Sequence, residues 1–299
     1  MRRVAIVVIL VIGAAVLGLW RSNGGVRQGL SRAVGAADDS QGEARDEIRK
    51  SFELQPGALL EVQGINGKVE IQTSDTKTAE VYVLRTGKSR DALSRREVII
   101  EQTATGLLVK GKSARHIGFW EHIFGKNPEE QVTIKAPRDI ALALKGINGR
   151  VTAGDIEGTL EAKGINGHVE IGRATESAEI SGINGNISVA LDKLGERGAR
   201  LSGINGGIEL KFGSDLNADL TAKGMNGNVR SEIPDVTVNK GEYGSNYTAR
   251  IGSGGAPITI SGINGNVRLT RVSGVPTASE KKSSEQKQEK VAQAKVSKD

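Results

Sequence analysis

The stretch Gly164–Ile171, GINGHVEI, decides how this chain folds, because the same phrase before a strand-like tetrapeptide occurs seven times. The other six copies begin at Gly64, Gly146, Gly182, Gly203, Gly224 and Gly262, and the copy at Gly224 has Met in place of Ile. The steps between successive first glycines are 82, 18, 18, 21, 21 and 38 residues. Self-similarity at a period of about 20 residues is typical of a solenoid, in which each repeat forms one coil.

Apolar and polar residues alternate on both sides of the phrase. In the copy at Gly164, Leu160 and Ala162 precede it and Val169 follows it, and every other copy has apolar residues at the same three positions. Alternation with period two on both sides of a glycine-rich tetrapeptide predicts strand, corner, strand. Asn-Gly supplies the backbone conformations with φ > 0 that a sharp corner requires.

Stacked coils explain the repeat better than seven separate hairpins. A lone coil buries too few apolar side chains to offset the entropy of ordering its backbone, whereas stacked coils share strand hydrogen bonds and a closed core. In such a stack the Ile residues fill the inside of the corner and the Asn residues form an amide ladder. The predicted ladder consists of Asn66, Asn148, Asn166, Asn184, Asn205, Asn226 and Asn264.

The two long steps are close to two and four short ones. The 38-residue step is therefore expected to contain one degenerate or looped-out coil, and the 82-residue step is close to four coils. With the copies stacked in sequence order, Asn264 is expected in the last coil, with a ladder neighbour on one side only.

The repeated Gly-Ile-Asn-Gly phrase before Val or Ile strands resembles the bacterial β-strand-repeat family known as putative adhesins, and the similar head GIN domain of autotransporter adhesins. The resemblance covers roughly Phe52 to Arg271. It implies a right-handed parallel β-helix or β-roll in an exported protein, and it brings no catalytic residues. The predicted fold class is thus all-β, a parallel β-helix or β-roll solenoid of about 20-residue coils with GING corners, preceded by an N-terminal membrane helix.

The N-terminus indicates a membrane segment. Arg2 and Arg3 precede the uncharged, mostly apolar run Val4–Trp20, which is at the lower limit of length for a spanning helix. An uncleaved anchor is favoured over a signal cleaved after Ala15. The charges before the run favour a single pass with the bulk of the chain in the periplasm or outside the cell, although the arginines after it argue for the opposite orientation.

The composition divides the rest of the chain. The predicted organisation is a membrane anchor or signal at 1–21, a flexible tether at 22–46, a solenoid domain at 47–271 and a disordered tail at 272–299. Within the domain, Ser89–Arg96 begins with a capping residue and predicts one or two helical turns.

An aromatic segment at 113–130 interrupts the strand pattern. It contains Phe119, Trp120 and Phe124, and the helical spacing of Ile117, Trp120, Glu121 and Phe124 predicts a short amphipathic segment. The main interpretation is a flap that covers an open side of the solenoid, and the alternative is an exposed contact site for a partner or the membrane surface. A metal site at His116 and His122 is disfavoured, because residues six apart do not share one helical face.

Charge and motifs exclude several classes of function. The net charge of +6 is dispersed along the chain and lacks the clustered basic face of a nucleic-acid binder. There is no cysteine, and no motif for a hydrolase, a metalloprotease or a phosphate-binding loop. We therefore predict a non-enzyme without a cofactor or a metal. The outward positions beside the corners do carry charges, namely Lys145, Lys163, Arg150, His168, Glu170 and Lys223, but without paired acids.

These observations predict a membrane-anchored structural or adhesion-like module of the cell envelope that binds a polysaccharide or a protein. Two alternatives remain open at this point. One is a carbohydrate-active enzyme of the polysaccharide lyase kind, which also uses a β-helix, and the other is a component of envelope-stress signalling.

Overall fold

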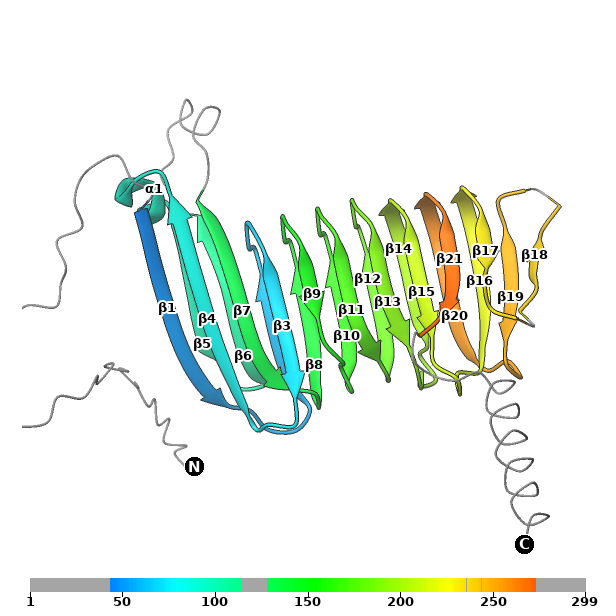
Figure 1. The fold of residues 1–299 in the computed structure, drawn as a ribbon, viewed down its shortest axis with the longest axis horizontal. Coiled ribbons are helices and arrows are strands. Elements are labelled where there is room, and N and C mark those ends of the chain that lie inside the picture. The colour runs from blue at the N-terminus through cyan, green and yellow to red at the C-terminus, as the bar shows by residue number, and fades with distance from the viewer. Residues whose placement is uncertain (1–43, 114–127, 235, 243, 273–299) are drawn as a thin grey trace, which may run out of the picture.

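The computed structural model describes residues 44–113, 128–234, 236–242 and 244–272. These residues form an elongated all-β body with one short helix, and their strands lie side by side along its long axis (Figure 1). The strands belong to two large mixed sheets of ten and eleven strands.

Both sheets have a parallel middle, and antiparallel pairs occur at both ends of the eleven-stranded sheet but at only one end of the ten-stranded sheet. In spatial order the ten-stranded sheet, sheet A, consists of β1 (Ala44–Glu53), β4 (Thr78–Gly87), β7 (Glu129–Pro137), β3 (Val69–Ser74), β9 (Val151–Ala153), β11 (Val169–Ala174), β13 (Ile187–Leu191), β15 (Ile208–Phe212), β21 (Val267–Arg271) and β17 (Val229–Ser231). The eleven-stranded sheet, sheet B, consists of β18 (Val238–Lys240), β19 (Tyr247–Ile251), β16 (Ala218–Asn226), β20 (Ala256–Asn264), β14 (Ala199–Asn205), β12 (Ser177–Ser181), β10 (Thr159–Lys163), β8 (Ile140–Lys145), β2 (Ala58–Gln63), β6 (Gly106–Ser113) and β5 (Arg96–Gln102).

Each Gly-Ile-Asn-Gly phrase joins a strand of sheet B to a strand of sheet A. The strands of successive repeats pair in parallel and in register, so that Val169 lies between Val151 and Ile187. The corresponding residues before the phrase pair in the same way, with Ala162 between Leu144 and Ile180. Parallel pairing, rather than a hairpin at each Asn-Gly, is therefore what the alternating pattern encodes.

One apolar core runs between the two sheets. The inward residues of each repeat are buried, for example Leu160, Ala162, Val169 and Ile171. The corner itself also contributes to the core. Ile165 is only 1% exposed, and its equivalents in the other six phrases are buried as well. The strands are short because each stops where the chain turns into the other sheet.

The structure corrects the interpretation of the 82-residue step. β2 pairs directly with β8, and β3 pairs directly with β9, so the phrases at Gly64 and Gly146 are neighbours in space. The intervening chain contains β4, one helix, β5, β6 and β7. Of these, β6 and β7 extend the parallel stack by one repeat beyond β2 and β3, while β4 and β5 close its end by antiparallel pairing.

The structure also corrects the expectation for the 38-residue step. The step contains the antiparallel hairpin β18–β19, which extends sheet B beyond β16, and not a degenerate or looped-out coil. The chain then returns, and β20 inserts between β14 and β16 while β21 inserts between β15 and β17. The last repeat in sequence is therefore the second to last in space. The sequence could not predict this order, because spacing along the chain does not determine which repeats are neighbours.

The closed end of the stack contains the only helix among the described residues, α1 (Arg90–Ser94). The side chain of Ser89 accepts a hydrogen bond from the backbone N–H of Ala92 at 3.2 Å, which confirms the predicted cap. Ala92 and Leu93 are buried beside β1, β4 and β5. Figure 1 shows α1 at the end of the stack opposite to β18 and β19.

No helix within the described residues has the length and apolar character needed to cross a membrane. The segment Val4–Trp20 lies outside the described residues, and the membrane anchor stays a prediction.

Candidate functional site

The corner owes its shape to the two glycines of each phrase. At Gly182 the backbone has φ = 63°, in the left-handed region that glycine adopts without strain. At Gly185 an added Cβ would lie 2.1 Å from the carbonyl oxygen of Gly167 in the preceding repeat. The second glycine is thus required because neighbouring repeats approach closely there, which holds the repeats at strand spacing across the corner.

The seven predicted asparagines lie in one row along the corners. In all of them except Asn66, the side-chain Nδ2 donates to the Oδ1 of the neighbour nearer the closed end, at 2.9 to 3.2 Å. In space the row consists of Asn66, Asn148, Asn166, Asn184, Asn205, Asn264 and Asn226. Asn264 therefore has a neighbour on both sides, contrary to the sequence-based expectation, and Asn226 is the terminal member.

The row is exposed and has hydrogen-bonding capacity to spare. Six of its members are exposed and Asn66 is half-buried. A carboxamide carries two N–H donors and two acceptor lone pairs on oxygen. An interior member uses one donor and one lone pair along the row, so one N–H and one lone pair remain for solvent or a ligand.

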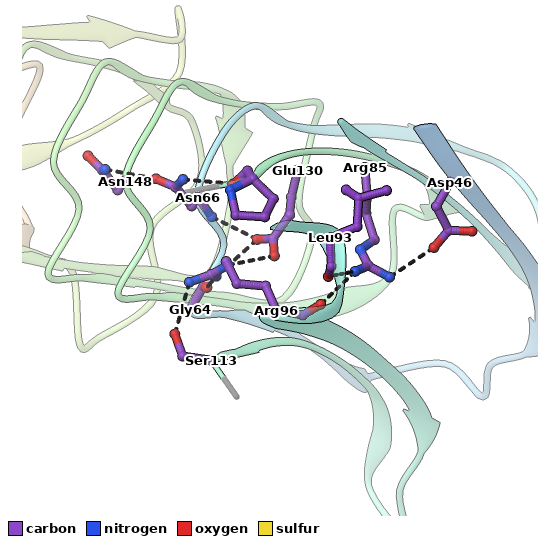
Figure 2. Close-up of polar contacts among 10 residues, drawn as sticks. Asp46, Gly64, Asn66, Arg85, Leu93, Arg96, Ser113, Glu130 and Asn148 are labelled. Carbon is purple, nitrogen blue, oxygen red and sulfur yellow. Dashed lines mark hydrogen bonds and ion pairs between the residues drawn. The ribbon is translucent and has the colours of Figure 1, made fainter. Parts of the chain in front are cut away.

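The row begins at a buried ion pair (Figure 2). The Glu130 side chain is fully buried, and Arg96 Nε donates to its Oε1 at 2.8 Å. Arg96 Nη2 also donates to Glu130 Oε2 at 3.1 Å and to the carbonyl oxygen of Gly64 at 2.6 Å. The two opposite charges therefore compensate each other, and Arg96 also satisfies the carbonyl of one corner. Buried charges are stable only with such partners.

β6 and β7 extend the stack by one repeat but have no Gly-Ile-Asn-Gly phrase between them, and Glu130 makes the hydrogen bonds that such a phrase would make. In interior repeats the Asn backbone N–H donates to the Ile carbonyl of the preceding phrase, as Asn148 does to Ile65 at 2.9 Å. Asn66 has no preceding phrase, and its N–H donates to Glu130 Oε2 at 2.9 Å instead. Its Nδ2 donates to the carbonyl oxygen of Pro128 at 3.0 Å, and its own carbonyl accepts from the Glu130 N–H at 2.8 Å.

A second arginine holds the surrounding elements together. Arg85 on β4 pairs with Asp46 on β1 at 2.8 Å. The same guanidinium donates to the carbonyl oxygens of Leu93, at the end of α1, and of Arg96, at 2.5 Å for the latter. Figure 2 shows Arg85 bound to the backbone carbonyl of Arg96, so Arg85 helps to fix the backbone position of Arg96.

Charged side chains on the outer face of sheet B form a connected lattice near the closed end. Lys145 lies 3.3 Å from Glu61 and 3.4 Å from Glu161, and Lys163 lies 2.9 Å from Glu161 and 3.0 Å from Glu179. The hydrogen bond from Lys163 lowers the pKa of Glu161 and in turn raises the pKa of Lys163. For Lys145, burial is the largest single influence and works downward, but Glu61 and Glu161 together raise its pKa.

The remaining sequence-predicted residues are dispersed. His168 lies at a corner, one residue before β11, and its neighbours in the adjacent repeats are Arg150 and Asn186. Glu170 lies on β11 of sheet A and Lys223 on β16 of sheet B. Within the described residues no group of three His, Cys, Asp or Glu side chains could hold a metal ion. The proposed contact residues Phe119, Trp120 and Phe124, with His116 and His122, lie outside the described residues.

Sequence reasoning missed the pair of Glu130 and Arg96. The two residues are 34 positions apart, and neither belongs to a repeated phrase. The one available signal is that the strand pattern resumes at Glu129 without a Gly-Ile-Asn-Gly corner before it.

The sequence matches no protein-family model and no curated protein. Three bacterial proteins are among the solved structures to which this structure is similar. A "putative cell adhesion protein" from Clostridium sporogenes ATCC 15579 has 12% identity and a TM-score of 0.39, covering 76% of this chain and 100% of that chain. A "putative adhesin" from Bacteroides fragilis NCTC 9343 has 9% identity and a TM-score of 0.35, with 75% and 97% covered. A "putative adhesin" from Parabacteroides merdae ATCC 43184 has 12% identity and a TM-score of 0.26, with 75% and 96% covered. The printed descriptions of these three proteins name adhesion proteins, as does the family that the Gly-Ile-Asn-Gly phrase resembles.

Proposed function

We propose that this protein is an exported, non-catalytic module of the cell envelope that binds a linear polysaccharide along its asparagine row. In this proposal Val4–Trp20 anchors the chain in the membrane as a single pass, and the strand-rich body lies on the periplasmic or outer side. The stack is proposed to be a parallel β-helix or β-roll, whose repeats hold every Asn side chain in an equivalent position.

The exposed asparagine row is the observation that carries the proposal. Neighbouring strands of a sheet lie about 4.8 Å apart, so the unused N–H and lone pair of each amide recur at that interval. A straight row of equivalent groups matches an extended partner with a repeating chemical structure. A small ligand would instead need a concave site that surrounds it.

Polysaccharide is favoured over protein because of the chemistry beside the row. Ser181, Ser202 and Ser261 pair in register on sheet B, each one residue before a corner glycine. Hydroxyls and carboxamides are both donor and acceptor, as are the hydroxyls of a sugar. The charged groups described on this half of the face are fewer, with Arg250 paired to Asp219 and Lys223 in register with Ser261, and they form no connected lattice like the one near the closed end.

The charged groups do not support the alternative of a lyase. A general base needs a pKa shifted toward the working pH, which means a raised carboxylate or a lowered lysine. Hydrogen bonds from Lys68 and Arg250 lower the pKa values of Glu70 and Asp219, and Glu161 is lowered as well. Lys145 and Lys163 are raised. All five shifts favour the charged form, which is the direction of a structural ion pair.

Co-sedimentation of the full-length protein with insoluble glycans tests the binding. Peptidoglycan sacculi, chitin and cellulose serve as probes, and Asn184→Ala/Asn205→Ala is compared with Glu170→Ala, an exposed change on the other sheet. The double variant is expected to bind roughly tenfold more weakly, as two lost hydrogen bonds allow. Absence of pelleting with every glycan, or an equal loss for Glu170→Ala, rules the proposal out.

A carbonate wash of membranes tests the anchor. The full-length protein is expected to stay with the membrane fraction, since an apolar spanning helix resists extraction. A shortened, soluble, exported species would show that the segment is a cleaved signal.

A further inference from the structure

Asparagine followed by glycine is chemically labile, and this chain places seven such pairs in one row. The backbone nitrogen of the glycine attacks the side-chain carbonyl carbon of the asparagine, and glycine has no side chain to obstruct the approach. The reaction needs two freedoms. The glycine nitrogen has to give up its proton, and the asparagine side chain has to turn toward it.

Six of the seven glycine nitrogens are engaged by the stack. Each donates its N–H to the Asn carbonyl oxygen of the next repeat at 2.9 to 3.0 Å. These donors are Gly67, Gly149, Gly167, Gly185, Gly206 and Gly265, and the last of them donates to Asn226. Among the described residues no further repeat lies beyond Asn226, and the N–H of Gly227 has no acceptor there.

The side chain of Asn226 is also the least restrained. Its Nδ2 donates to Asn264 Oδ1 at 2.9 Å, whereas no described residue donates to its Oδ1. Every interior member is held from both sides. Both partners of the reaction are thus released at the same place, the open end of the row.

We propose that Asn226 is a site of spontaneous modification, where succinimide formation and hydrolysis convert it to aspartate or isoaspartate. The Gly227 nitrogen forms a bond to Cγ of Asn226, the bond from Cγ to Nδ2 breaks, and the displaced nitrogen leaves as ammonia with the amide proton. Water then opens the ring at either carbonyl, and no oxidant or reductant is involved. The product carries a new carboxylate facing Asn264 Oδ1, so the last bond of the row is lost.

The chain contains a matched internal control. Asn226 lies in the sequence Asn-Gly-Asn-Val-Arg, and Asn264 lies in the same five residues. Apart from the preceding residue, Met225 or Ile263, their local sequences are identical, so their intrinsic reactivities should be close and the main difference is their place in the stack. Trypsin separates the two, because Asn226 falls in the peptide 224–230 and Asn264 in the peptide 251–268.

The test is to age the folded full-length protein in warm, mildly alkaline buffer and follow both peptides by mass spectrometry and isoaspartate-resolving chromatography. Product at Asn226 is expected to accumulate roughly tenfold faster than at Asn264, the ratio that one backbone hydrogen bond allows. In concentrated urea both peptides should react at the same rate. Equal rates in the folded protein overturn the proposal, and so does an unreactive Asn226 over a period in which both sites react in urea.

Discussion

The two ends of the asparagine row are terminated in opposite ways. At the Asn66 end, Pro128 accepts from the side chain and Glu130 accepts from the backbone N–H, with Arg96 completing the network. At the Asn226 end, the side-chain Oδ1 and the Gly227 N–H have no described partner. At the first end Glu130 is buried and Asn66 is half-buried, whereas Asn226 at the second end is exposed.

The comparison shows that burial decides how a repeat ends. Buried polar groups without partners are costly, so the closed end needs dedicated side chains from outside the repeat. At the exposed end water satisfies the same groups at little cost. The closed end should therefore be sensitive to single substitutions, and the open end should tolerate them.

The largest effect is expected for Glu130→Gln. The change leaves Arg96 as a largely buried charge without its partner, and removing one member of a buried pair costs about 3–5 kcal/mol. The matched control is Glu80→Gln, whose pair with Lys135 is exposed on both sides and should contribute less than about 1 kcal/mol. Urea unfolding of the full-length variants measures both values. A cost below that of the control would show that the closed end does not depend on this pair.

A smaller effect is expected when the row itself is interrupted. Asn184→Ala and Asn264→Ala each remove two side-chain hydrogen bonds and should cost about 1–3 kcal/mol, whereas Asn226→Ala removes one and should cost about 0.5–1.5 kcal/mol. The unfolding midpoints of the three variants give the ranking. A cost for Asn264→Ala that matches Asn226→Ala and not Asn184→Ala would contradict the inserted position of the last repeat.

The smallest effect concerns pH and the charged lattice beside the closed end. The pKa of Glu161 is lowered by the hydrogen bond from Lys163, so the unfolded chain binds this proton more tightly than the folded chain. Its stabilisation is present above the ordinary carboxyl pKa and is lost as the pH falls through the folded value. Thermal unfolding between neutral and acidic pH should show a loss of a few tenths of a kcal/mol attributable to this group, because the side chains are partly exposed. Glu161→Gln should reduce the pH dependence, and an unchanged profile would exclude this contribution.

Much of the repeat could be predicted from the sequence, because identical residues at a fixed spacing have to occupy equivalent places. The buried Ile165 and its equivalents, and the alternation of Leu160 with Glu161, follow from that rule. The order of the repeats could not be predicted. Strands β14, β16 and β20 present compatible residues to one another, so local sequence does not tell which two are neighbours.

The closed end was beyond prediction for a different reason. Glu130 and Arg96 are single residues in strands that resemble any other charged strand. Their importance arises only because β6 and β7 extend the stack without a Gly-Ile-Asn-Gly corner. The role of Glu130 and Arg96 thus depends on a corner phrase that is absent, and the residues around either position in the sequence do not reveal that absence.

The inserted position of β20 and β21 has a consequence for biogenesis. A chain that emerges from its N-terminus completes β16 and β17 before β20 and β21 exist, yet the finished stack places the later pair inside the earlier one. The earlier pair must therefore stay detached, or first dock against β14 and β15 and then be displaced. Co-translational growth by simple addition, repeat upon repeat, ends at β15. Among the described residues, the strands from β16 onward reach their final arrangement only after β21 has been synthesised, so a truncation before Ala256 removes the inner partner of strands that were already made.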